Sequence, residues 1–527
     1  MLDEKLKRNL NCLLSSINSQ LKIFINKYKD NYNLKLDIEN LIYSHPIYLN
    51  FQHIINFKNL INYYDIENLE KIQKRKQESE MYKIREKEFN KIQDFVQENY
   101  KESSLNININ EEEKKTKDNN TFLNKKIKNV TFEKCYICKK IFKIDEIHKF
   151  YTNLCKKCGD YNYSFREMTF DWEDRIAIIT GGRVKIGFNI AIKLLSYNCK
   201  VLITTRFPKD ALLRYQSHPN YELWKKNLFI YPIDFRFIDS TVKFIQFIEK
   251  TFPYVDFLIN NAAQTIRRNT DYYKYLLSIE NKTLNDEDTI IIKNSYQTLS
   301  LKNNNLENLI TDESLVKISS NNINQETFPL SVIASQFKII EEKYQPIKTI
   351  IGFDGQPYDF SKEKNSWQLE IDEIPFQEFL EVQIINTWTP YYLCVKLKPL
   401  LEKSPFKDKY IVNVSSIEGI FNSIRRSSFH PHTNMAKAAL NMMTKTCGSY
   451  YKKSKIYMTS VDTGWVSPMN NAGVVFKKKD NFENEIKNLP LDEIDGAMRV
   501  LFPIIEGIVN KKYLYGILLK NYTQVNW

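Results

Sequence analysis

An apolar run that breaks into a glycine-rich turn and then into an amphipathic helix constrains the fold of this chain most. The turn spans Thr180 to Gly187, and helical periodicity continues to Ser196. Gly181 and Gly182 allow a tight turn with no side chain between backbone and ligand. The helix N-terminus that follows presents unpaired N–H groups and the positive end of its dipole. The sequence therefore predicts a seat for the pyrophosphate of a dinucleotide.

Polar motifs follow this turn, each at the predicted end of a strand or start of a helix. From residue 174 onward the pattern alternates between strand and helix, which predicts a parallel sheet covered on both faces. Polar side chains at these positions gather at the carboxyl edge of such a sheet, where ligands bind. The predicted strands are Arg175–Thr180, Lys200–Thr205, Leu228–Pro232, Val255–Asn260, Lys409–Val414, Ile456–Val461 and Leu514–Leu519.

The order of the motifs resembles the short-chain dehydrogenase/reductase family, from about Trp172 to the C-terminus. The family's Thr-Gly-x-x-x-Gly-x-Gly turn falls on Thr180 to Gly187, and its Asn-Asn-Ala-Gly strand end falls on Asn260 to Ala263. Two positions depart from the family pattern. Lys185 occupies the middle glycine of the turn, and Thr433 stands where the catalytic tyrosine is expected.

The resemblance implies an α/β fold, a doubly wound parallel-sheet Rossmann domain over residues 172–527. An insertion at about 268–363 interrupts it and is much longer than the usual connection. The apolar flank Tyr272–Ile279 is interpreted either as a lid over the active site or as a surface excursion. The cofactor-binding residues that the resemblance and the turn indicate are Thr180, Gly181, Gly182, Arg183, Lys185, Ile186, Gly187, Arg206, Asp234, Asn261, Ala262, Lys437, Thr463 and Gly464.

The resemblance also implies a catalytic set for hydride transfer to a carbonyl. Lys437 is expected to reach the nicotinamide ribose and to hold positive charge near the reacting oxygen. Ser416 is expected to donate a hydrogen bond to the carbonyl, although strand register can exchange it with Ser415. Asn386 lies among apolar neighbours, so it is either part of a proton relay or a satisfied buried amide.

Thr433 cannot replace a tyrosine as an acid, because an aliphatic hydroxyl does not titrate in the ordinary range. Three outcomes follow: His432 or His430 provides the proton, a tyrosine from elsewhere enters the pocket, or reduction is lost. An imidazole suits acid–base work near neutral pH. However, His432 lies one position before Thr433 and would face about 100° away on a continuing helix, which favours an outward orientation.

The end of the second predicted strand indicates which cofactor is preferred. NAD-selective enzymes usually place an acid there, whereas this strand ends at Arg206. Arg206, with Arg183 or Lys185, can bind a 2′-phosphate, so NADP(H) is preferred over NAD(H); a surface arginine is the alternative. Lys185 either contacts phosphate or crowds the pyrophosphate. The resemblance places Asp234 at the adenine end.

Four cysteines form a separate motif ahead of the Rossmann domain. Cys135 and Cys138 make one Cys-x-x-Cys pair, and Cys155 and Cys158 follow after sixteen residues. This spacing predicts a zinc ribbon over residues 131–165, with a closed structural zinc rather than a catalytic one. Iron is a minor alternative. His148 lies between the pairs and is interpreted as a packing or surface residue.

Composition bounds the rest of the chain. The segment before Gly159 contains Pro46 as its only proline, so residues 1–101 are interpreted as a helical Lys/Asn-rich extension and 102–130 as a disordered linker. The net charge of +13 comes from lysines spread among acids, so a nucleic-acid partner is not expected. No apolar run approaches the roughly 20 residues that span a bilayer, and no signal peptide is evident, so a cytoplasmic location is expected.

Two functional hypotheses follow. The leading one is an NADP(H)-dependent oxidoreductase that acts on a small carbonyl or alcohol substrate, with a homodimer implied by the resemblance. The alternative is a non-catalytic dinucleotide-binding protein that acts as an interaction or regulatory protein. Loss of tyrosine at Thr433 favours the alternative, and retention of Asn386, Ser416 and Lys437 favours the enzyme.

Overall fold

Two compact units make up the described chain. The smaller contains residues 75–87 and 132–161, and the larger contains residue 90 and the described residues from 162 onward. The expected linker, most of the expected helical extension and most of the insertion lie outside the described residues. The computed structural model describes residues 75–87, 90, 132–268, 270–281, 351–352, 356–359, 364–422, 427–469 and 489–527.

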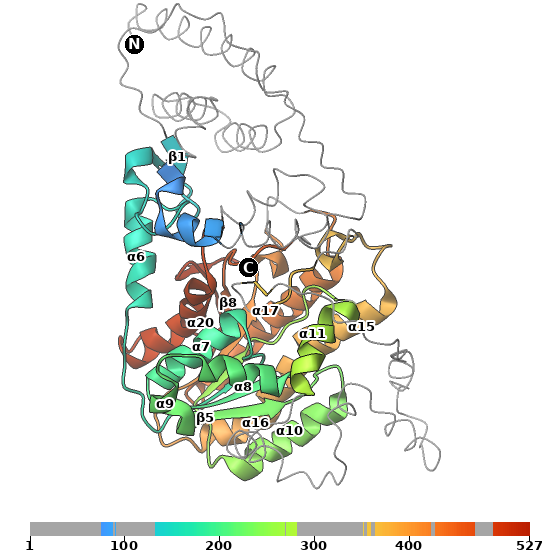
Figure 1. Ribbon diagram of the computed structural model, residues 1–527. Helices are drawn as coiled ribbons and strands as arrows, with labels where there is room; N and C mark the ends of the chain where they lie inside the picture. Colours follow the sequence, from blue (N-terminus) through green and yellow to red (C-terminus); the bar gives the residue numbers. More distant parts are fainter. Residues whose placement is uncertain are drawn as a thin grey trace, which may run out of the picture. The chain divides into compact units, whose positions relative to one another are not determined.

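An eight-stranded sheet lies at the centre of the larger unit (Figure 1). Its strand order is β10-β9-β8-β7-β6-β3-β4-β5. Neighbouring strands are parallel except β9 and β10, which pair antiparallel. The order reverses direction after β3, so β3 and β6 flank the switch point where ligands bind in such sheets. The strands are β3 (Ile176–Ile179), β4 (Lys200–Thr205), β5 (Leu228–Pro232), β6 (Phe257–Asn260), β7 (Lys409–Ser415), β8 (Ile456–Asp462), β9 (Leu518–Lys520) and β10 (Thr523–Val525).

Helices cover both faces of this sheet, and the strands from β3 to β8 are buried except at Lys200 and Phe229. In β3, Ala177 and Ile179 pack into one apolar core, and Ile176 and Ile178 pack into the other. Such two-sided burial explains the continuous apolar runs in the sequence, and it confirms the predicted doubly wound α/β fold. Helices α7 (Lys185–Ser196), α8 (Pro208–Gln216) and α20 (Glu493–Ile508) line the first core, and α10 (Ile238–Thr251), α16 (Thr389–Glu402) and α17 (Pro431–Lys452) line the second.

The long helix expected before β7 is divided by a π-helical turn. Helix α15 (Phe376–Gln383) leads into η6 (Ile384–Trp388), and α16 continues from it. A single turn of this kind widens the helix locally and is frequent at functional sites. Here it contains Asn386, whose side chain is 1% exposed.

The described ends of the insertion lie together at its base. Helix α11 (Thr270–Glu280) follows Arg268, which forms an ion pair with Asp359 on the returning segment. The Tyr272 hydroxyl donates to Gln356 Oε1 at 2.8 Å. The outgoing and returning segments of the insertion therefore contact each other next to the Rossmann domain.

The smaller unit is built on a short antiparallel hairpin and a helix. Strands β1 (Phe132–Lys134) and β2 (Ile141–Lys143) precede η1 (Ile144–Glu146) and α6 (Lys156–Arg166), which continues into the larger unit. Helical residues 80–87 pack in this unit too, because the Met81 amide donates to the Phe150 carbonyl and the Met81 and Tyr82 side chains are buried. Part of the N-terminal extension is thus integral to the cysteine-bearing unit.

Among the described helices, none combines the length and apolar character that crossing a bilayer requires.

Candidate functional site

The glycine turn is interlocked with the end of β6. Gly181 adopts a left-handed φ of +73°, and a Cβ added at Gly187 would lie 2.0 Å from the Gly181 carbonyl oxygen. The Thr180 hydroxyl accepts hydrogen bonds from the amides of Asn261 and Ala262, both at 3.0 Å. In return, Asn261 Nδ2 donates to the carbonyls of Thr180 and Gly181 at 3.1 and 2.9 Å. The structure brings these five predicted residues together, and their tight packing fits a dinucleotide seat.

Lys185 occupies the glycine position of the turn with glycine-like geometry. Its φ is +54°, a left-handed conformation that costs a non-glycine residue roughly 1–2 kcal/mol. The ammonium group lies 3.5 Å from Ser467 Oγ, in the segment after β8. Ile186 packs against Gly496 of α20, and a Cβ at Gly182 would lie 2.5 Å from Ile203 Cβ. These two residues therefore position the turn through packing against its surroundings.

Arg183 is held by a carboxylate of α8. Its Nη1 lies 2.6 Å from Asp210 Oδ2, and Arg214 Nε contacts the same oxygen at 2.7 Å. Burial lowers the pKa of Arg183, partly offset by Asp210. In this structure Arg183 anchors the glycine turn to α8.

Arg206 lies at the end of β4, as predicted, and contacts an aromatic pair. Its Nη2 donates to the Tyr273 hydroxyl at 3.2 Å, and its guanidinium lies 5.0 Å from the Tyr273 ring centroid and 5.5 Å from that of Phe207. Burial alone would lower the pKa of Arg206, but neighbouring Tyr273 and Asp234 raise it. Tyr273 belongs to the flank Tyr272–Ile279 of the insertion, for which a lid over the active site was one of the two interpretations, but its pairing with Arg206 was not predicted.

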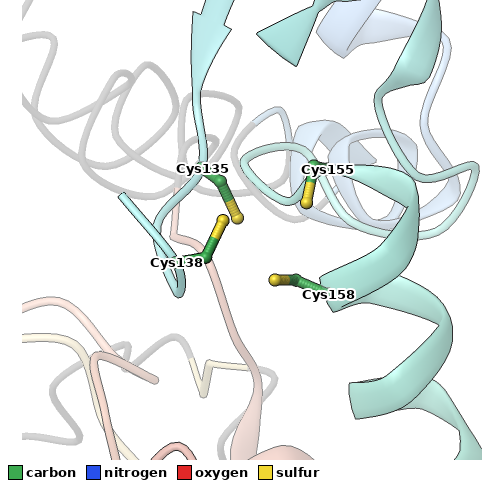
Figure 2. A group of neighbouring side chains, drawn as sticks. All are labelled: Cys135, Cys138, Cys155 and Cys158. Atoms are coloured by element: carbon green, nitrogen blue, oxygen red, sulfur yellow. The ribbon is translucent and has the colours of Figure 1, made fainter. Parts of the chain in front are cut away.

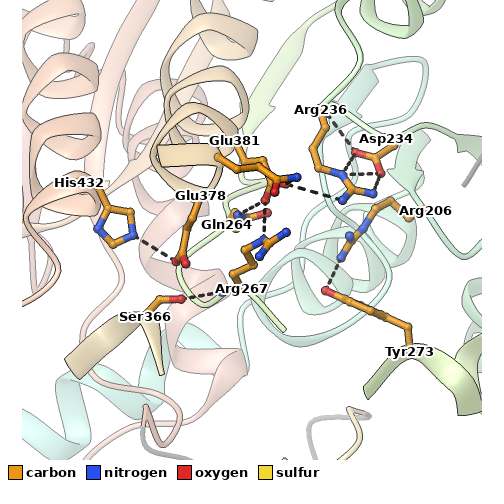
Figure 3. Close-up of polar contacts among 11 residues, drawn as sticks. Arg206, Asp234, Arg236, Gln264, Arg267, Tyr273, Ser366, Glu378, Glu381 and His432 are labelled. Carbon is orange, nitrogen blue, oxygen red and sulfur yellow. Dashed lines mark hydrogen bonds and ion pairs between the residues drawn. The ribbon is translucent and has the colours of Figure 1, made fainter. Parts of the chain in front are cut away.

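Asp234, after β5, is bound by Arg236 rather than left open (Figure 3). Arg236 Nη2 lies 2.6 Å from Asp234 Oδ2, and Arg236 Nε contacts both carboxylate oxygens. Burial would raise the pKa of Asp234, but Arg236 and then Arg206 outweigh burial and lower it. The carboxylate is therefore charged and fixed at the predicted adenine end.

A buried carboxylate on α15 connects this region to the loop after β6. Glu381 is 1% exposed, and its Oε2 accepts from Gln264 Nε2 at 2.8 Å and lies 3.4 Å from Arg267 Nε (Figure 3). Its Oε1 lies 4.0 Å from Arg236 Nη1. The sequence offered one signal for this group: carboxylates at Glu378 and Glu381 interrupt an apolar helix at the spacing of one turn.

The Asn386 side chain is satisfied by the backbone of Gln264. Its Oδ1 accepts from the Gln264 amide at 2.8 Å, and its Nδ2 donates to the Gln264 carbonyl at 3.0 Å. Of the two sequence interpretations, the satisfied buried amide describes the side chain. Asn386 thus fixes the loop after β6 to the π-helical turn.

Lys437 is buried one turn into α17 beside the end of β7. Its Nζ donates to the Val414 carbonyl at 2.9 Å, and burial lowers its pKa to about 8, partly offset by Asp462. Ser415 is buried and donates to the Lys437 carbonyl, whereas half-buried Ser416 accepts from the Glu418 amide at 3.1 Å. Ser416 is thus the serine turned away from the core.

The segment after β8 is tied to the same edge of the sheet. Asp462 accepts from the Gly464 amide with Oδ1 at 2.9 Å and from the Ile417 amide with Oδ2 at 2.8 Å. Gly464 adopts a left-handed φ of +79°, and Thr463 is half-buried beside it. The resembled loop therefore turns at Gly464 without a proline.

The first turn of α17 carries buried polar atoms without a hydrogen-bond partner among the described residues. They are Thr433 Oγ1, His432 Nδ1 and His430 Nε2. The expectation that His432 faces outward is wrong: its side chain is 1% exposed and its Nε2 lies 3.3 Å from Glu378 Oε1 (Figure 3). The helix α15 packs against α17 and supplies this carboxylate, which a single helical wheel cannot show.

His430 is held differently from His432. It adopts a left-handed φ of +44°, its ring stacks on Trp367 at 3.7 Å, and its Nδ1 lies 2.9 Å from the Trp367 carbonyl oxygen. Burial lowers the pKa of His430, only partly offset by the Trp367 carbonyl. The neutral ring is thus favoured at His430. His432, by contrast, contacts a carboxylate through Nε2.

The four cysteines of the smaller unit converge (Figure 2). The sulfur atoms of Cys135, Cys138, Cys155 and Cys158 all lie within 4.8 Å of one another. Tetrahedral thiolates at about 2.3 Å from a zinc ion satisfy this spacing. His148 is buried and accepts from the Phe150 amide through Nδ1 at 3.1 Å. It also packs so tightly on the α6 backbone that a Cβ at Gly159 would lie 2.3 Å from its ring. His148 is therefore a packing residue outside the cysteine cluster.

Comparison with known proteins agrees with the geometry. The family model for short chain dehydrogenases matches residues 175–282, which include the glycine turn, Arg206, Asp234 and Asn261. A relative from Acanthamoeba polyphaga mimivirus, uncharacterized protein R665, is 28% identical over 389 residues, covering 72% of each chain.

The chain is also similar to solved structures, two of which follow. RhlG with NADP from Pseudomonas aeruginosa shares 14% identity, with 67% of this chain and 96% of that chain covered and a TM-score of 0.40. The carbonyl reductase Sniffer of D. melanogaster shares 17% identity, with 67% and 100% covered and a TM-score of 0.39.

Proposed function

We propose that this chain is an NADP(H)-dependent oxidoreductase of the short-chain dehydrogenase/reductase type that interconverts a carbonyl and an alcohol. One observation carries the proposal: the turn from Thr180 to Gly187 is locked to Asn261 at the switch point of the sheet. Lys437 is buried at the same carboxyl edge, at the end of β7. The family match to residues 175–282 supports it independently.

The residues at this edge fit a dinucleotide. Gly181 and Gly187 leave backbone rather than side chain at the turn, the first turn of α7 offers N–H groups to a pyrophosphate, and Arg206 is placed for a 2′-phosphate. Bound there, the nicotinamide supplies or accepts the hydride. Ser416 donates to the substrate oxygen, and the Lys437 ammonium stabilises negative charge that develops on it.

The proton that the missing tyrosine would supply comes, in this proposal, from His432. Glu378 binds Nε2, so Nδ1 is the ring nitrogen that exchanges a proton with the substrate oxygen. The carboxylate orients the ring, as carboxylates do for catalytic histidines, and in carbonyl reduction the Nδ1 proton passes to the substrate oxygen. Thr433, with a buried hydroxyl beside His432, contributes a hydrogen bond to water or substrate at the position of the tyrosine.

Titration with NADPH and NADH, followed by fluorescence, tests the proposal. We expect NADPH to bind more tightly than NADH, and Arg206→Ala to remove most of that preference. Lys437→Ala should weaken both nucleotides through the ribose contact. Absence of binding by either nucleotide would instead favour a protein that has lost the cofactor seat.

We further propose that the four cysteines hold a structural zinc ion. Four thiolates close the coordination sphere, so the ion stabilises a unit too small to bury a sizeable core. Metal analysis of the purified protein should find zinc, and Cys135→Ser should release it while Cys447→Ser should not. Recovery of the cysteines as disulfides without metal would contradict this assignment.

A homodimer remains a proposal, and an apolar groove between α15, α16 and α17 supports it. The groove has a volume of about 460 Å³ and includes Trp388, Tyr391 and Met443 among its lining residues. Tyr391 and Met442 expose 53% and 57% of their surfaces on α16 and α17. Light scattering with and without Tyr391→Asp decides whether a second copy covers this face.

A further inference from the structure

Selectivity for NADPH requires a positive group that is both fixed in place and free to pair with a 2′-phosphate. The region around the end of β4 contains three arginines that could serve. Arg183 forms an ion pair at 2.6 Å with Asp210, which Arg214 shares, and Arg236 forms one at 2.6 Å with Asp234. Arg206, in the described part of the chain, forms no ion pair with a carboxylate.

A neutral phenol holds Arg206 instead. Arg206 Nη2 donates to the Tyr273 hydroxyl at 3.2 Å, and the guanidinium lies within 5.5 Å of the ring centroids of both Tyr273 and Phe207. Those two rings stack at 5.8 Å with an interplanar angle of 22°. A free arginine loses rotamer entropy when it binds an anion, so prior fixation by aromatic contacts strengthens binding without neutralising the charge.

Helix α11 brings Tyr273 to this position and is itself fastened to α8. At its C-terminal end, the Glu280 carboxylate accepts from the amides of Lys209 and Asp210 at 3.1 and 2.9 Å. These amides are orphan donors of the first turn of α8, so Glu280 caps that helix. Glu280 already accepts from the N-terminal amides of α8, so these amides do not bind a 2′-phosphate. Arg206 is then the group at the end of β4 that would bind it.

We propose that Tyr273, supplied by the insertion, is a positioning residue that sets the preference of Arg206 for NADPH over NADH. The inference rests on the proposed cofactor function and goes beyond it, because it gives the insertion a role in cofactor selection. In Figure 3 the Tyr273 hydroxyl points toward the Arg206 guanidinium from the opposite side of the site to Glu381.

The test compares four variants with wild type in calorimetric titrations. Tyr273→Phe removes the hydroxyl and keeps the ring, and Tyr273→Leu removes both. Tyr272→Phe is the matched control, because its hydroxyl binds Gln356 rather than Arg206. Arg206→Ala tests the cofactor function itself. The ligands are NADPH, NADH, adenosine 2′,5′-bisphosphate and AMP, the last two reporting the adenosine end alone.

We expect Tyr273→Phe to weaken NADPH and adenosine 2′,5′-bisphosphate by about three- to tenfold and to leave NADH and AMP unchanged. Tyr273→Leu should have a larger effect with the same selectivity, and Tyr272→Phe should behave as wild type. Two results would overturn the role of Tyr273 but not the proposed function. In the first, the Tyr273 variants weaken the ligands with and without a 2′-phosphate equally. In the second, they bind all four ligands as wild type does, while Arg206→Ala abolishes the preference for NADPH. Failure of wild type to bind any of the four ligands would overturn the proposed function instead.

Discussion

The two ends of the candidate site are held in opposite ways. At the glycine turn, Thr180 and Asn261 satisfy one another through four hydrogen bonds to backbone groups, with Ala262 and Gly181 as the remaining partners. At the first turn of α17, buried polar atoms of His432 and Thr433 lack partners among the described residues. Groups of the protein itself complete one end, whereas at the other end the described residues supply no partner for these atoms.

This difference separates what the fold requires from what the reaction requires. A satisfied network rigidifies a backbone turn before any ligand arrives, and so preorganises the seat. A buried polar atom without a partner costs about 1–3 kcal/mol, so it persists where water or substrate restores the hydrogen bond. We therefore expect mutations at the glycine turn to affect cofactor binding, and mutations at His432 to affect turnover alone.

Gly187→Ala should have the largest effect of these variants, a loss of NADPH affinity. The added Cβ would lie 2.0 Å from the Gly181 carbonyl oxygen, so the backbone of the turn must shift. We expect the affinity for NADPH to fall about a hundredfold or more, which corresponds to about 2.8 kcal/mol. Calorimetric titration with NADPH measures the loss. Ser196→Ala, at the exposed end of the same helix, is the control. Unchanged affinity in Gly187→Ala would show that the turn does not contact the cofactor.

His432→Asn should lower kcat for carbonyl reduction and leave the affinity for the cofactor unchanged. General acid catalysis contributes about a hundredfold or more, so kcat for carbonyl reduction should fall by that order. Glu378→Gln should reduce kcat less and shift its pH profile, because His432 keeps its place but loses the carboxylate. The charged and titratable groups around His432 are Glu378 on α15 and His430 before α17. His218→Asn, outside the site, controls for loss of a histidine. If both variants retain full kcat, the proton comes from another group.

A pH titration distinguishes the contribution of Lys437. Burial lowers its pKa to about 8, so the ammonium is present below this pH and is lost as pH rises through it. We expect kcat/KM to fall about tenfold for each pH unit above about 8 if the charge is essential. The sign for stability is the opposite: between about 8 and its unfolded value near 10.4, the folded state binds fewer protons, so this group favours folding as pH rises. A flat kcat/KM profile up to pH values near 10 would contradict a charged role.

Glu280→Gln should give the smallest effect, on stability. Burial raises the Glu280 pKa to about 7, against the backbone donors that lower it. Between the ordinary glutamate pKa and this raised value, the folded state binds more protons than the unfolded state. The contribution of protonated Glu280 to the free energy of unfolding is therefore lost as pH rises through about 7. The amide keeps an acceptor for the α8 cap without a buried charge. Thermal melts should show Glu280→Gln more stable than wild type by a few degrees at a pH of about 8 and similar at a pH of about 5. A lower melting temperature at both pH values would show that the carboxylate charge is needed for the cap.

The parallel sheet was predictable because its strands are buried on both faces and appear as continuous apolar runs. Lys200–Thr205 and Leu228–Pro232 end where expected, and the motif at Asn260 to Ala263 lies at the end of β6. The final strand was predicted over Leu514–Leu519, but β9 spans Leu518–Lys520. The antiparallel strand β10 was not predicted, because a strand of three residues is too short to show an alternation of apolar and polar side chains.

The site was predictable where a backbone motif defines it and not where distant side chains meet. Spacing indicated the turn at Gly181 and the lysine at Lys437. The pairing of His432 with Glu378 depends on how α15 packs against α17, and that of Arg206 with Tyr273 depends on where the insertion folds back. Neither contact leaves a local pattern, since the partners are 54 and 67 residues apart.

Calorimetric titration of the full-length protein with NADPH and then NADH tests the central claim most directly. A preformed seat, with an Arg206 that forms no ion pair among the described residues, predicts one binding site per chain, with NADPH bound about tenfold more tightly than NADH. Absence of binding heat with both nucleotides, confirmed by an unchanged melting temperature, would contradict the account.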